Sequence, residues 1–547
     1  MLFKQKASLM ISQGMGDSKS SFQKGLPQFV AVMVKNILLV SFGMTLGYPT
    51  ILIPSLTSGD RNEEIQLTPE QVSWIGSINL MCVPIGCLLS GVLTTPVGRR
   101  RSMQVICFPL AASWLTFNFA KEVWHVYLAL SITGLCGGLV EAPVLSYVAE
   151  ITTPRLRGML SVSSTLSLTF GILLEFVIGS VLHWRTVALI SVAPPVLSFI
   201  LLCFMPESPH WLIMRNKIQQ AQKSLAWLRG WTTFDAVKEE FDAMCLSHRV
   251  SRKTGAINEA FDGSVSDVNT KSFVDQPTSF FKEKLANSKN FIKKSFLWPL
   301  AMVSFIYFLA NFTGSWTLQT YAVKIFGTLN SPMDKYHATI LLGLVEFIGC
   351  LVCVFFVRLC GKRVMAFVSI CAVGICGIVV GTYAYTNDIR YLQLNDAANA
   401  SATPTIDSHN WVPLVFLIIL AFVHHCGLKP LPWILIGEIY SHNTRATGCG
   451  ISSAVSYLFG FLANKLFLDM IKSMTISGTY WFYAAISFVG CLVLYFILPE
   501  TEGRSLQEIS DHFAGDARLD NKFRRKLNEG ESDRDTDLSK VNSISIS

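Results

Sequence analysis

Residues 147–158 read YVAEITTPRLRG, and residues 437–448 read GEIYSHNTRATG. In both stretches a long apolar run ends on a glutamate, Glu150 or Glu438, and an arginine follows seven residues later, Arg157 or Arg445. An acid at the end of one membrane helix and a guanidinium at the start of the next can pair across the short loop between them. The repetition of this arrangement predicts that the chain consists of two similar halves.

Other short motifs repeat in the same order along the chain. Gly98-Arg99-Arg100 returns as Gly361-Lys362-Arg363, and Pro206-Glu207-Ser208 returns as Pro499-Glu500-Thr501. Duplicated halves in a strongly apolar chain are typical of membrane transporters. We expect the charged members of the repeats to form ion pairs on one side of the membrane. They are Arg99, Arg100, Glu150, Arg157 and Glu207 in the first half, and Lys362, Arg363, Glu438, Arg445 and Glu500 in the second.

The composition indicates a membrane protein. Of 547 residues, 51% are hydrophobic and only 15% are charged, which is rare in a soluble chain. The fourteen cysteines lie mostly in apolar runs, so we expect neither a disulfide framework nor a metal site. No nucleotide-binding loop or nucleophile motif is visible, so we expect no cofactor and no enzymatic activity. No basic cluster interleaved with aromatic residues suggests a nucleic-acid partner.

Apolar runs of about 20 residues, the length that crosses a bilayer, predict an all-α membrane protein with about twelve transmembrane helices in two six-helix bundles. The first six helices are expected near residues 28–53, 72–95, 102–120, 123–148, 159–182 and 184–205. The second six are expected near residues 296–326, 337–359, 363–385, 411–437, 446–470 and 479–498.

The polar segments complete the predicted organisation. Residues 1–27 form an N-terminal arm, 28–205 the first bundle, 206–294 a linker, 295–498 the second bundle, and 499–547 a C-terminal tail. Within the linker, Ile218, Ala221, Leu225 and Leu228 share one helical face. Phe234, Val237, Phe241 and Met244 share another, which predicts two short amphipathic helices.

Lysine and arginine in the short loops fall on one side of the predicted helices, which the positive-inside rule assigns to the cytoplasm. We therefore expect both termini to be cytoplasmic, with the plasma membrane as the default location and an intracellular membrane as the alternative. The longest outer loop, near residues 386–410, contains Asn399-Ala-Ser401. This triplet is a candidate glycosylation site.

The combined motifs resemble those of the sugar-porter family of the major facilitator superfamily. The family pattern Gly-x-x-x-Asp-Arg-x-Gly-Arg-Arg corresponds to residues 91–100, and Pro-Glu-Ser-Pro-Arg-Trp-Leu to residues 206–212. Pro-Trp-x-x-x-x-Glu-Ile corresponds to residues 432–439, and Pro-Glu-Thr-x-Gly to residues 499–503. Within that family, the runs at 43–54 and 464–467 are most similar to facilitated trehalose transporters.

The resemblance implies transport by alternating access, with the repeated ion pairs stabilising the closed cytoplasmic side. A simpler alternative is that these charges only anchor helix ends at the lipid headgroups. The resemblance also places the substrate site, although most family amides are replaced here. The corresponding residues are Thr165, Asn311, Thr313, Trp316, Gln319, Glu346, Trp433 and Ser456. For each of them, packing between helices is an alternative role.

Charged residues inside apolar runs are costly and must pair, face the protein interior, reach the interface or be neutral. Glu141, Glu175, Glu346 and Lys429 are of this kind. We expect Lys429 and Glu346 to form an ion pair and Lys35 to reach the interface. The adjacent His424 and His425 are expected to pack or form hydrogen bonds, because neighbouring helical positions point about 100° apart.

The resulting hypothesis is a facilitative carrier for a sugar, either a hexose or a disaccharide such as trehalose. Proton-coupled members of the family have an aspartate where this chain has Thr45, so the resemblance favours passive transport. The alternatives are a proton-coupled or non-sugar carrier, and a non-transporting sensor on a carrier scaffold. The expected partners are a small-molecule substrate and membrane lipid, and the protein is expected to be monomeric.

Overall fold

The computed structural model describes residues 21–57, 63, 65–246, 293–394, 410–440, 444–504, 506–515 and 519. The chain divides into two compact units. Unit 1 comprises Met1–Ser55, Arg61–Leu67 and Ile78–Pro277, and unit 2 comprises Leu56–Asp60, Thr68–Ser77 and Thr278–Ser547.

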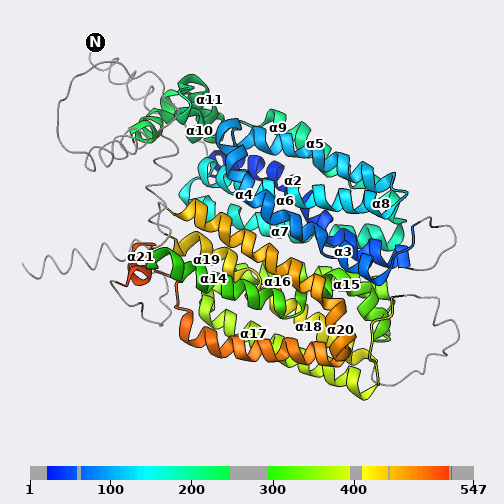
Figure 1. Cartoon of the computed structure of the whole chain (residues 1–547). Helices are drawn as coiled ribbons and strands as arrows, with labels where there is room; N and C mark the ends of the chain where they lie inside the picture. The colour runs from blue at the N-terminus through cyan, green and yellow to red at the C-terminus, as the bar shows by residue number, and fades with distance from the viewer. Residues whose placement is uncertain are drawn as a thin grey trace, which may run out of the picture. The chain divides into compact units, whose positions relative to one another are not determined.

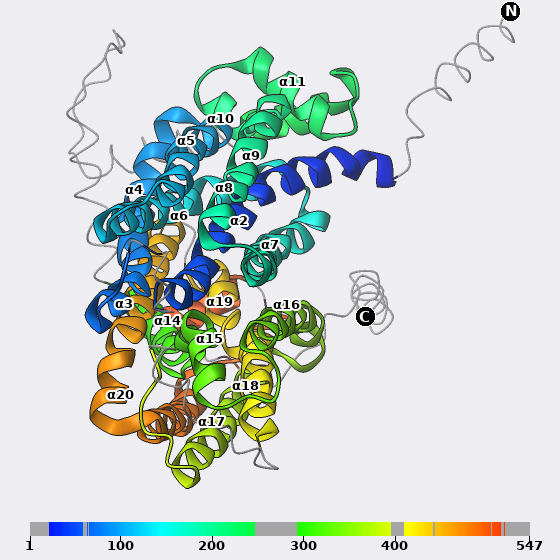
Figure 2. The ribbon, with the colours of Figure 1, turned by 90° about the vertical axis from the view of Figure 1, so that its right-hand side faces the viewer.

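Unit 1 is a bundle of long helices followed by short ones. The long helices are α2 (Ser21–Thr57), α4 (Ile78–Val97), α5 (Arg99–Asn118), α6 (Val123–Ile151) and α7 (Pro154–Val181). The shorter helices are α8 (Trp184–Ile190), α9 (Ala193–Phe204), α10 (Pro209–Met214) and α11 (Ile218–Leu228). Figures 1 and 2 show α10 and α11 together at one end of this bundle.

Unit 1 also contains the 3₁₀ helix η1 (Asp235–Val237), and unit 2 contains the other helices of the described residues. They are α3 (Pro69–Ile75), α14 (Lys294–Phe312), α15 (Ser315–Thr328), α16 (Lys335–Cys360), α17 (Lys362–Thr386), α18 (Trp411–Val423), the π-helix η3 (His424–Leu428), α19 (Leu431–Ile439), α20 (Arg445–Ile497) and α21 (Leu506–Ala514). Helix α3 belongs here because Asn464 Nδ2 donates to Gly76 O at 2.9 Å and Ser73 Oγ donates to Lys465 O at 3.0 Å.

The predicted all-α membrane fold is confirmed. Among the described residues, ten helical segments are long and apolar enough to cross a membrane. One of them, Thr447–Ile497, contains the last two predicted helices, which the left-handed backbone of Thr475 (φ 69°) separates. The predicted third helix is α5, which is too polar to be among the ten.

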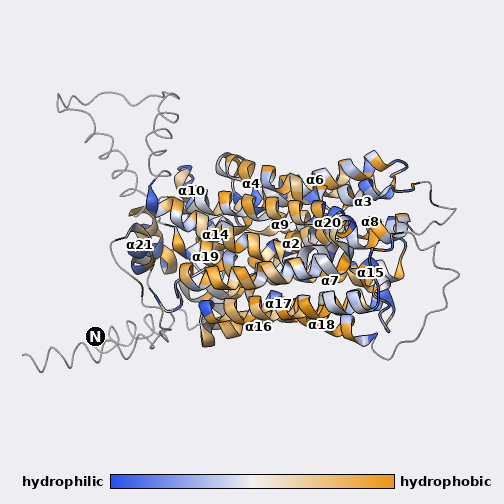
Figure 3. Cartoon of the chain, turned by 60° about the horizontal axis from the view of Figure 1, so that its bottom comes forward, coloured by the Kyte–Doolittle hydropathy of each residue, from blue (hydrophilic) through white to orange (hydrophobic). Residues whose placement is uncertain are grey.

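The long helices α16, α17 and α18 of unit 2 consist mostly of hydrophobic residues (Figure 3), and several of their apolar side chains are exposed. Phe355 on α16 is 67% exposed, and Val368 on α17 is 57% exposed. A water-soluble bundle would bury or replace side chains of this kind. Lipid therefore is the solvent for these faces.

The segments after α9 confirm the predicted amphipathic faces except at the first residue of each face. Ala221, Leu225 and Val237 are buried together. Ile218 and Phe234, which begin the two predicted apolar faces, are 39% and 49% exposed. The predicted C-terminal tail begins with a folded part, since Ile509 and Phe513 of α21 join the core of unit 2.

Small residues allow α4 and α6 to approach closely inside unit 1. A Cβ atom added to Gly138 would lie 2.1 Å from Val83 O, and one added to Gly86 would lie 2.3 Å from Leu135 O. Because helices in lipid gain little from burying apolar surface, this close backbone contact supplies much of their attraction.

We predict that Gly138→Ala destabilises unit 1 by about 1–3 kcal/mol, because the added methyl group collides with backbone rather than with a movable side chain. Gly91→Ala is the matched control on α4, since a Cβ there meets nothing within 4 Å. The thermal unfolding midpoint of the detergent-solubilised protein should fall for Gly138→Ala and hold or rise for Gly91→Ala. Equal unfolding midpoints for the two variants would contradict the proposed role of the close contact between α4 and α6.

Candidate functional site

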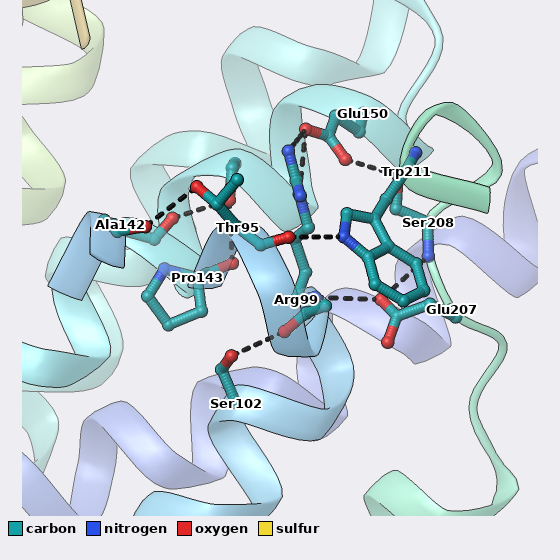
Figure 4. A network of polar contacts seen from close by, with 12 residues as sticks. Thr95, Arg99, Ser102, Ala142, Pro143, Glu150, Glu207, Ser208 and Trp211 are labelled. Carbon is teal, nitrogen blue, oxygen red and sulfur yellow. Dashed lines mark hydrogen bonds and ion pairs between the residues drawn. The ribbon is translucent and has the colours of Figure 1, made fainter. Parts of the chain in front are cut away.

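An ion-pair network joins the ends of several helices in unit 1. Arg99, the first residue of α5, donates from Nε and from a terminal guanidinium nitrogen to Glu150 Oε1, at 3.1 and 2.8 Å. Glu150, near the end of α6, also accepts a hydrogen bond from Ser208 Oγ. Figure 4 shows these side chains converging from three segments. Both charges are largely buried, so the contact is screened less than a surface pair.

Glu207 caps the start of α5 in the same network. Its carboxylate accepts from the backbone N–H groups of Arg99 at 3.1 Å and Arg100 at 3.0 Å. These N–H groups have no partner within the helix, and the helix dipole favours a negative charge beside them. The preceding Gly98 has φ 105°, a conformation that residues with a side chain rarely adopt.

Trp211 fixes α10 beside this network. Its indole Nε1 donates to Thr95 O at 2.9 Å, as Figure 4 also shows. Thr95 stands where the sugar-porter pattern has an aspartate, yet its carbonyl still links the end of α4 to α10. The motif at residues 206–212 is therefore explained by contacts inside unit 1.

Unit 2 repeats the arrangement with different chemistry. Lys362 begins α17, and its ammonium contacts Glu438 Oε2 at 2.7 Å and Glu502 Oε2 at 2.9 Å. Glu500 accepts from the backbone N–H groups of Lys362 at 3.2 Å and Arg363 at 3.0 Å. Gly361, with φ 84°, takes the place of Gly98.

The sequence thus identified most members of both networks but not all of their partners. Glu150 pairs with Arg99, and Glu438 pairs with Lys362. The side chains of Arg157 and Arg445 lie outside the described residues, so their predicted pairing across the short loops stays a prediction. Arg100 and Arg363 each donate to a backbone carbonyl, of Met205 and Tyr495 respectively.

Several predicted substrate residues of unit 2 flank a break in a membrane segment. Helix α14 ends at Phe312 and α15 begins at Ser315, with Gly314 at φ 89° between them. Asn311 is buried, and its Nδ2 donates to Tyr307 O at 2.6 Å in its own helix. Thr313 is also buried. Broken helices of this kind supply polar groups at the binding sites of transporters.

Beyond this break lies a buried-charge cluster formed by Trp316, Gln319, Glu346, His425 and Lys429. Lys429 Nζ lies 2.9 Å from His425 Nε2, 3.4 Å from Gln319 Oε1 and 4.7 Å from the centre of the Trp316 ring. His425 Nε2 in turn lies 3.9 Å from Glu346 Oε2. Glu346, Gln319 and His425 are each 1% exposed, whereas Lys429 and Trp316 are half-buried.

The cluster corrects the predicted ion pair. Among the described residues, no contact within 4.0 Å joins Lys429 to Glu346, because His425 lies between the two side chains. Hydrogen bonding of both histidines is confirmed: His424 Nε2 donates to Ala310 O and His425 Nδ1 donates to Ala421 O, each at 2.9 Å. The contact of His425 with Lys429 was missed, although the two residues are four apart, a spacing at which side chains of one helix are neighbours.

The remaining predicted substrate residues are more scattered. Trp433 is half-buried and packs edge-on against Tyr307 and Tyr457, with ring centres 5.4 and 5.9 Å away. Ser456 on α20 is buried. Thr165 belongs to unit 1, where its side chain is exposed on α7. The candidate glycosylation site Asn399 lies outside the described residues.

Unit 1 has buried charges of its own. Lys35 is fully buried and donates to Ser164 Oγ at 2.5 Å, so the prediction that it reaches the interface is wrong. Glu141, on α6, is half-buried. Glu175 is fully buried, and its Oε2 accepts from Ser191 Oγ at 3.4 Å.

Comparisons with known proteins agree with this architecture. The family model described as "Sugar (and other) transporter" matches residues 45–513. Facilitated trehalose transporter Tret1 of Apis mellifera ligustica is 28% identical over 494 residues, covering 90% of this chain and 89% of that protein. The Bombyx mori protein of the same name is 27% identical, covering 88% and 86%.

Solved structures show the same fold. The proton:xylose symporter XylE bound to 6-bromo-6-deoxy-D-glucose is 19% identical and superposes with a TM-score of 0.64, covering 90% of this chain and 100% of that chain. A partially occluded inward-open conformation of XylE from E. coli superposes with a TM-score of 0.65 at 18% identity, covering 87% and 99%. The chain therefore has the major facilitator fold.

We predict that Lys362→Met destabilises unit 2 more than any exposed lysine substitution does. The ammonium is 2% exposed, and its loss leaves Glu438 and Glu502 facing each other without a counter-charge. Since both acids keep some contact with solvent, we expect a loss of about 2–3 kcal/mol rather than the full cost of a buried pair.

Lys472→Met is the matched control, because Lys472 is exposed on α20. Tryptophan fluorescence during thermal unfolding in detergent measures both variants. A midpoint for Lys362→Met equal to that of Lys472→Met would show that the network contributes nothing to stability.

Proposed function

Because the chain belongs to the sugar (and other) transporter family, we propose that it carries a sugar passively across a membrane by alternating access. The substrate is a hexose or a disaccharide such as trehalose, the sugar named for the relatives in Apis mellifera ligustica and Bombyx mori. The protein crosses the membrane several times, as its apolar helical segments require.

The repeated networks are the observation that carries this proposal. Arg99 with Glu150, and Lys362 with Glu438, each join the start of one helix to the end of another inside one unit. Glu207 and Glu500 cap the same helices. Each unit thereby holds its helix ends together, which suits a cycle in which two bundles move as bodies rather than by internal rearrangement.

The polar and aromatic groups of unit 2 suit a sugar. Trp433 and Trp316 are half-buried, so part of each ring is open to contact an apolar sugar face. Gln319, Asn311 and Thr313 offer amide and hydroxyl groups, which donate and accept hydrogen bonds as sugar hydroxyls do. We propose these five residues as substrate ligands, together with Ser456 and, in unit 1, Thr165.

Passive rather than proton-driven transport follows from the first membrane helix. Thr45 stands where proton-coupled members of the family have an aspartate, and its hydroxyl donates to Phe42 O at 2.7 Å. Unlike a carboxylate, this hydroxyl does not ionise near neutral pH, so Thr45 does not carry a coupled proton. Sugar would then move down its concentration gradient, whatever the pH difference across the membrane.

We also propose the orientation, the membrane and the oligomeric state of the protein. The positive-inside rule places both termini and both networks in the cytoplasm, and we take the plasma membrane as its location. Asn399 would then face outward and accept a glycan. We propose that the carrier works as a monomer surrounded by lipid.

Trp433→Ala should raise the apparent KM for sugar by roughly tenfold, because an aromatic contact is worth on the order of 1 kcal/mol or more. Counterflow of labelled glucose and trehalose into proteoliposomes measures the effect. Trp298→Ala is the control, since Trp298 on α14 is 44% exposed and outside the proposed site. Unchanged KM in Trp433→Ala would remove this residue from the site.

The same vesicles test the reaction itself. The final accumulation of sugar should be indifferent to a proton ionophore, and a panel of organic acids should not compete with the sugar. Exchange of an organic acid without exchange of either sugar would identify a non-sugar carrier. If none of these solutes exchanges, the result would favour the alternative of a non-transporting sensor on a carrier scaffold.

A further inference from the structure

Glu346 is an acid in surroundings that do not suit its charged form. It lies on α16, is 1% exposed, and neither of its carboxylate oxygens has a hydrogen-bond partner among the described residues. An ionised carboxylate is strongly unfavourable in such surroundings, whereas the protonated acid is tolerated. The geometry therefore corresponds to Glu346 with its proton bound.

The groups around Glu346 define what its ionisation would attract. His425 on η3 comes nearest, but its Nδ1 hydrogen is given to Ala421 O, so its Nε2 is an acceptor and the ring is neutral. Lys429, which follows η3, is the nearby cation, since its Nζ lies 2.9 Å from the same His425 Nε2 that faces Glu346. His424 is turned away toward Ala310 O.

The other helices packed against α16 add no charge to this site. Helix α15 presents Gln319 and Trp316, which contact Lys429. Within the described ranges, no ion pair or hydrogen bond connects α17 or α18 to Glu346. On its own helix, Cys350 is buried, and a thiol in apolar surroundings is uncharged. Lys429 is thus the cation available to an ionised Glu346.

We propose that Glu346 is a proton-binding site that regulates sugar binding by setting which groups Lys429 contacts; this inference rests on the proposed function. With Glu346 protonated, the ammonium binds His425 and Gln319 and covers the ring of Trp316, as the distances above describe. When Glu346 releases its proton, the new carboxylate attracts the ammonium away from Gln319 and Trp316. The π-helix beside Lys429 is a type of irregularity often found at such functional positions.

The direction of the pH effect follows from this exchange of partners. In the protonated state, Lys429 occupies the Gln319 oxygen and the Trp316 face that the sugar would use, so it competes with the sugar. Ionisation of Glu346 removes this competition. Sugar affinity therefore rises with pH, and sugar binding favours release of the proton.

Two substitutions distinguish a proton-binding role of Glu346 from a structural one. Both should abolish the pH dependence of KM, one by fixing KM at its high value and the other by fixing it at its low value. Glu346→Gln mimics the protonated acid and should keep the high KM at every pH. Lys429→Met removes the competitor and should keep a low KM at every pH. Wild-type KM should fall by roughly five- to tenfold from acid to alkaline pH, the usual scale of coupling between two sites.

The experiment is equilibrium exchange of labelled glucose or trehalose in proteoliposomes with the same pH on both sides. Glu175→Gln is the matched control, since Glu175 is another fully buried glutamate, in unit 1. It should retain the wild-type pH profile. A wild-type profile in Glu346→Gln, or a shift of both cluster variants in the same direction, would overturn the proposal.

A measurement without substrate tests the proton site independently. Infrared difference spectra of the reconstituted protein between acid and alkaline pH should contain a carboxylic-acid carbonyl component that is absent from Glu346→Gln and present in Glu175→Gln. Its presence in Glu346→Gln would overturn the assignment. If no sugar exchanges in any variant, the proposed function fails, while the infrared result still decides whether Glu346 binds the proton.

Discussion

A charge inside an apolar bundle needs a partner within reach, and this requirement determines the positions of the polar side chains in both units. Lys362 meets it with two carboxylates, and Arg99 with one. Glu346 meets it differently, since its geometry suits a neutral acid beside the neutral ring of His425. The same physical constraint thus produces stable networks at helix ends and a proton-sensitive cluster deeper in unit 2.

The two units share the geometry of the repeated helix-end network but differ in the charged residues that they carry. Glu207 and Glu500 cap α5 and α17 in the same way, after glycines of similar backbone conformation. At another pair of equivalent positions, the two units carry opposite charges. Glu141 and Lys429 each lie nine residues before the glutamate of their network, at 150 and 438, yet one is an acid and the other a base. The two units therefore carry different charged residues inside the same helical arrangement.

The sequence predicted the fold class and the helix-end networks well, because apolar length and repeated charged motifs are local signals. It did not predict where helices break. The interruption at Gly314 and the π-helix at His424 lie inside continuous apolar runs, from which we expected unbroken helices near 296–326 and 411–437. The expected pair of Lys429 and Glu346 failed because the ammonium of Lys429 contacts His425, four residues earlier, and His425 in turn faces Glu346. The proposed sugar contacts still rest on the resemblance and on side-chain chemistry.

Glu502 has a consequence that reaches beyond ion pairing. It follows the last membrane helix, yet it supplies one of the two acids on Lys362, and α21 then adds Ile509 and Phe513 to the core of unit 2. The start of the C-terminal segment is thus part of the folded bundle and not an appendage. A chain truncated before Glu502 would lose an ion pair and part of the hydrophobic core of unit 2. Tags and fusions are therefore best attached well downstream of α21.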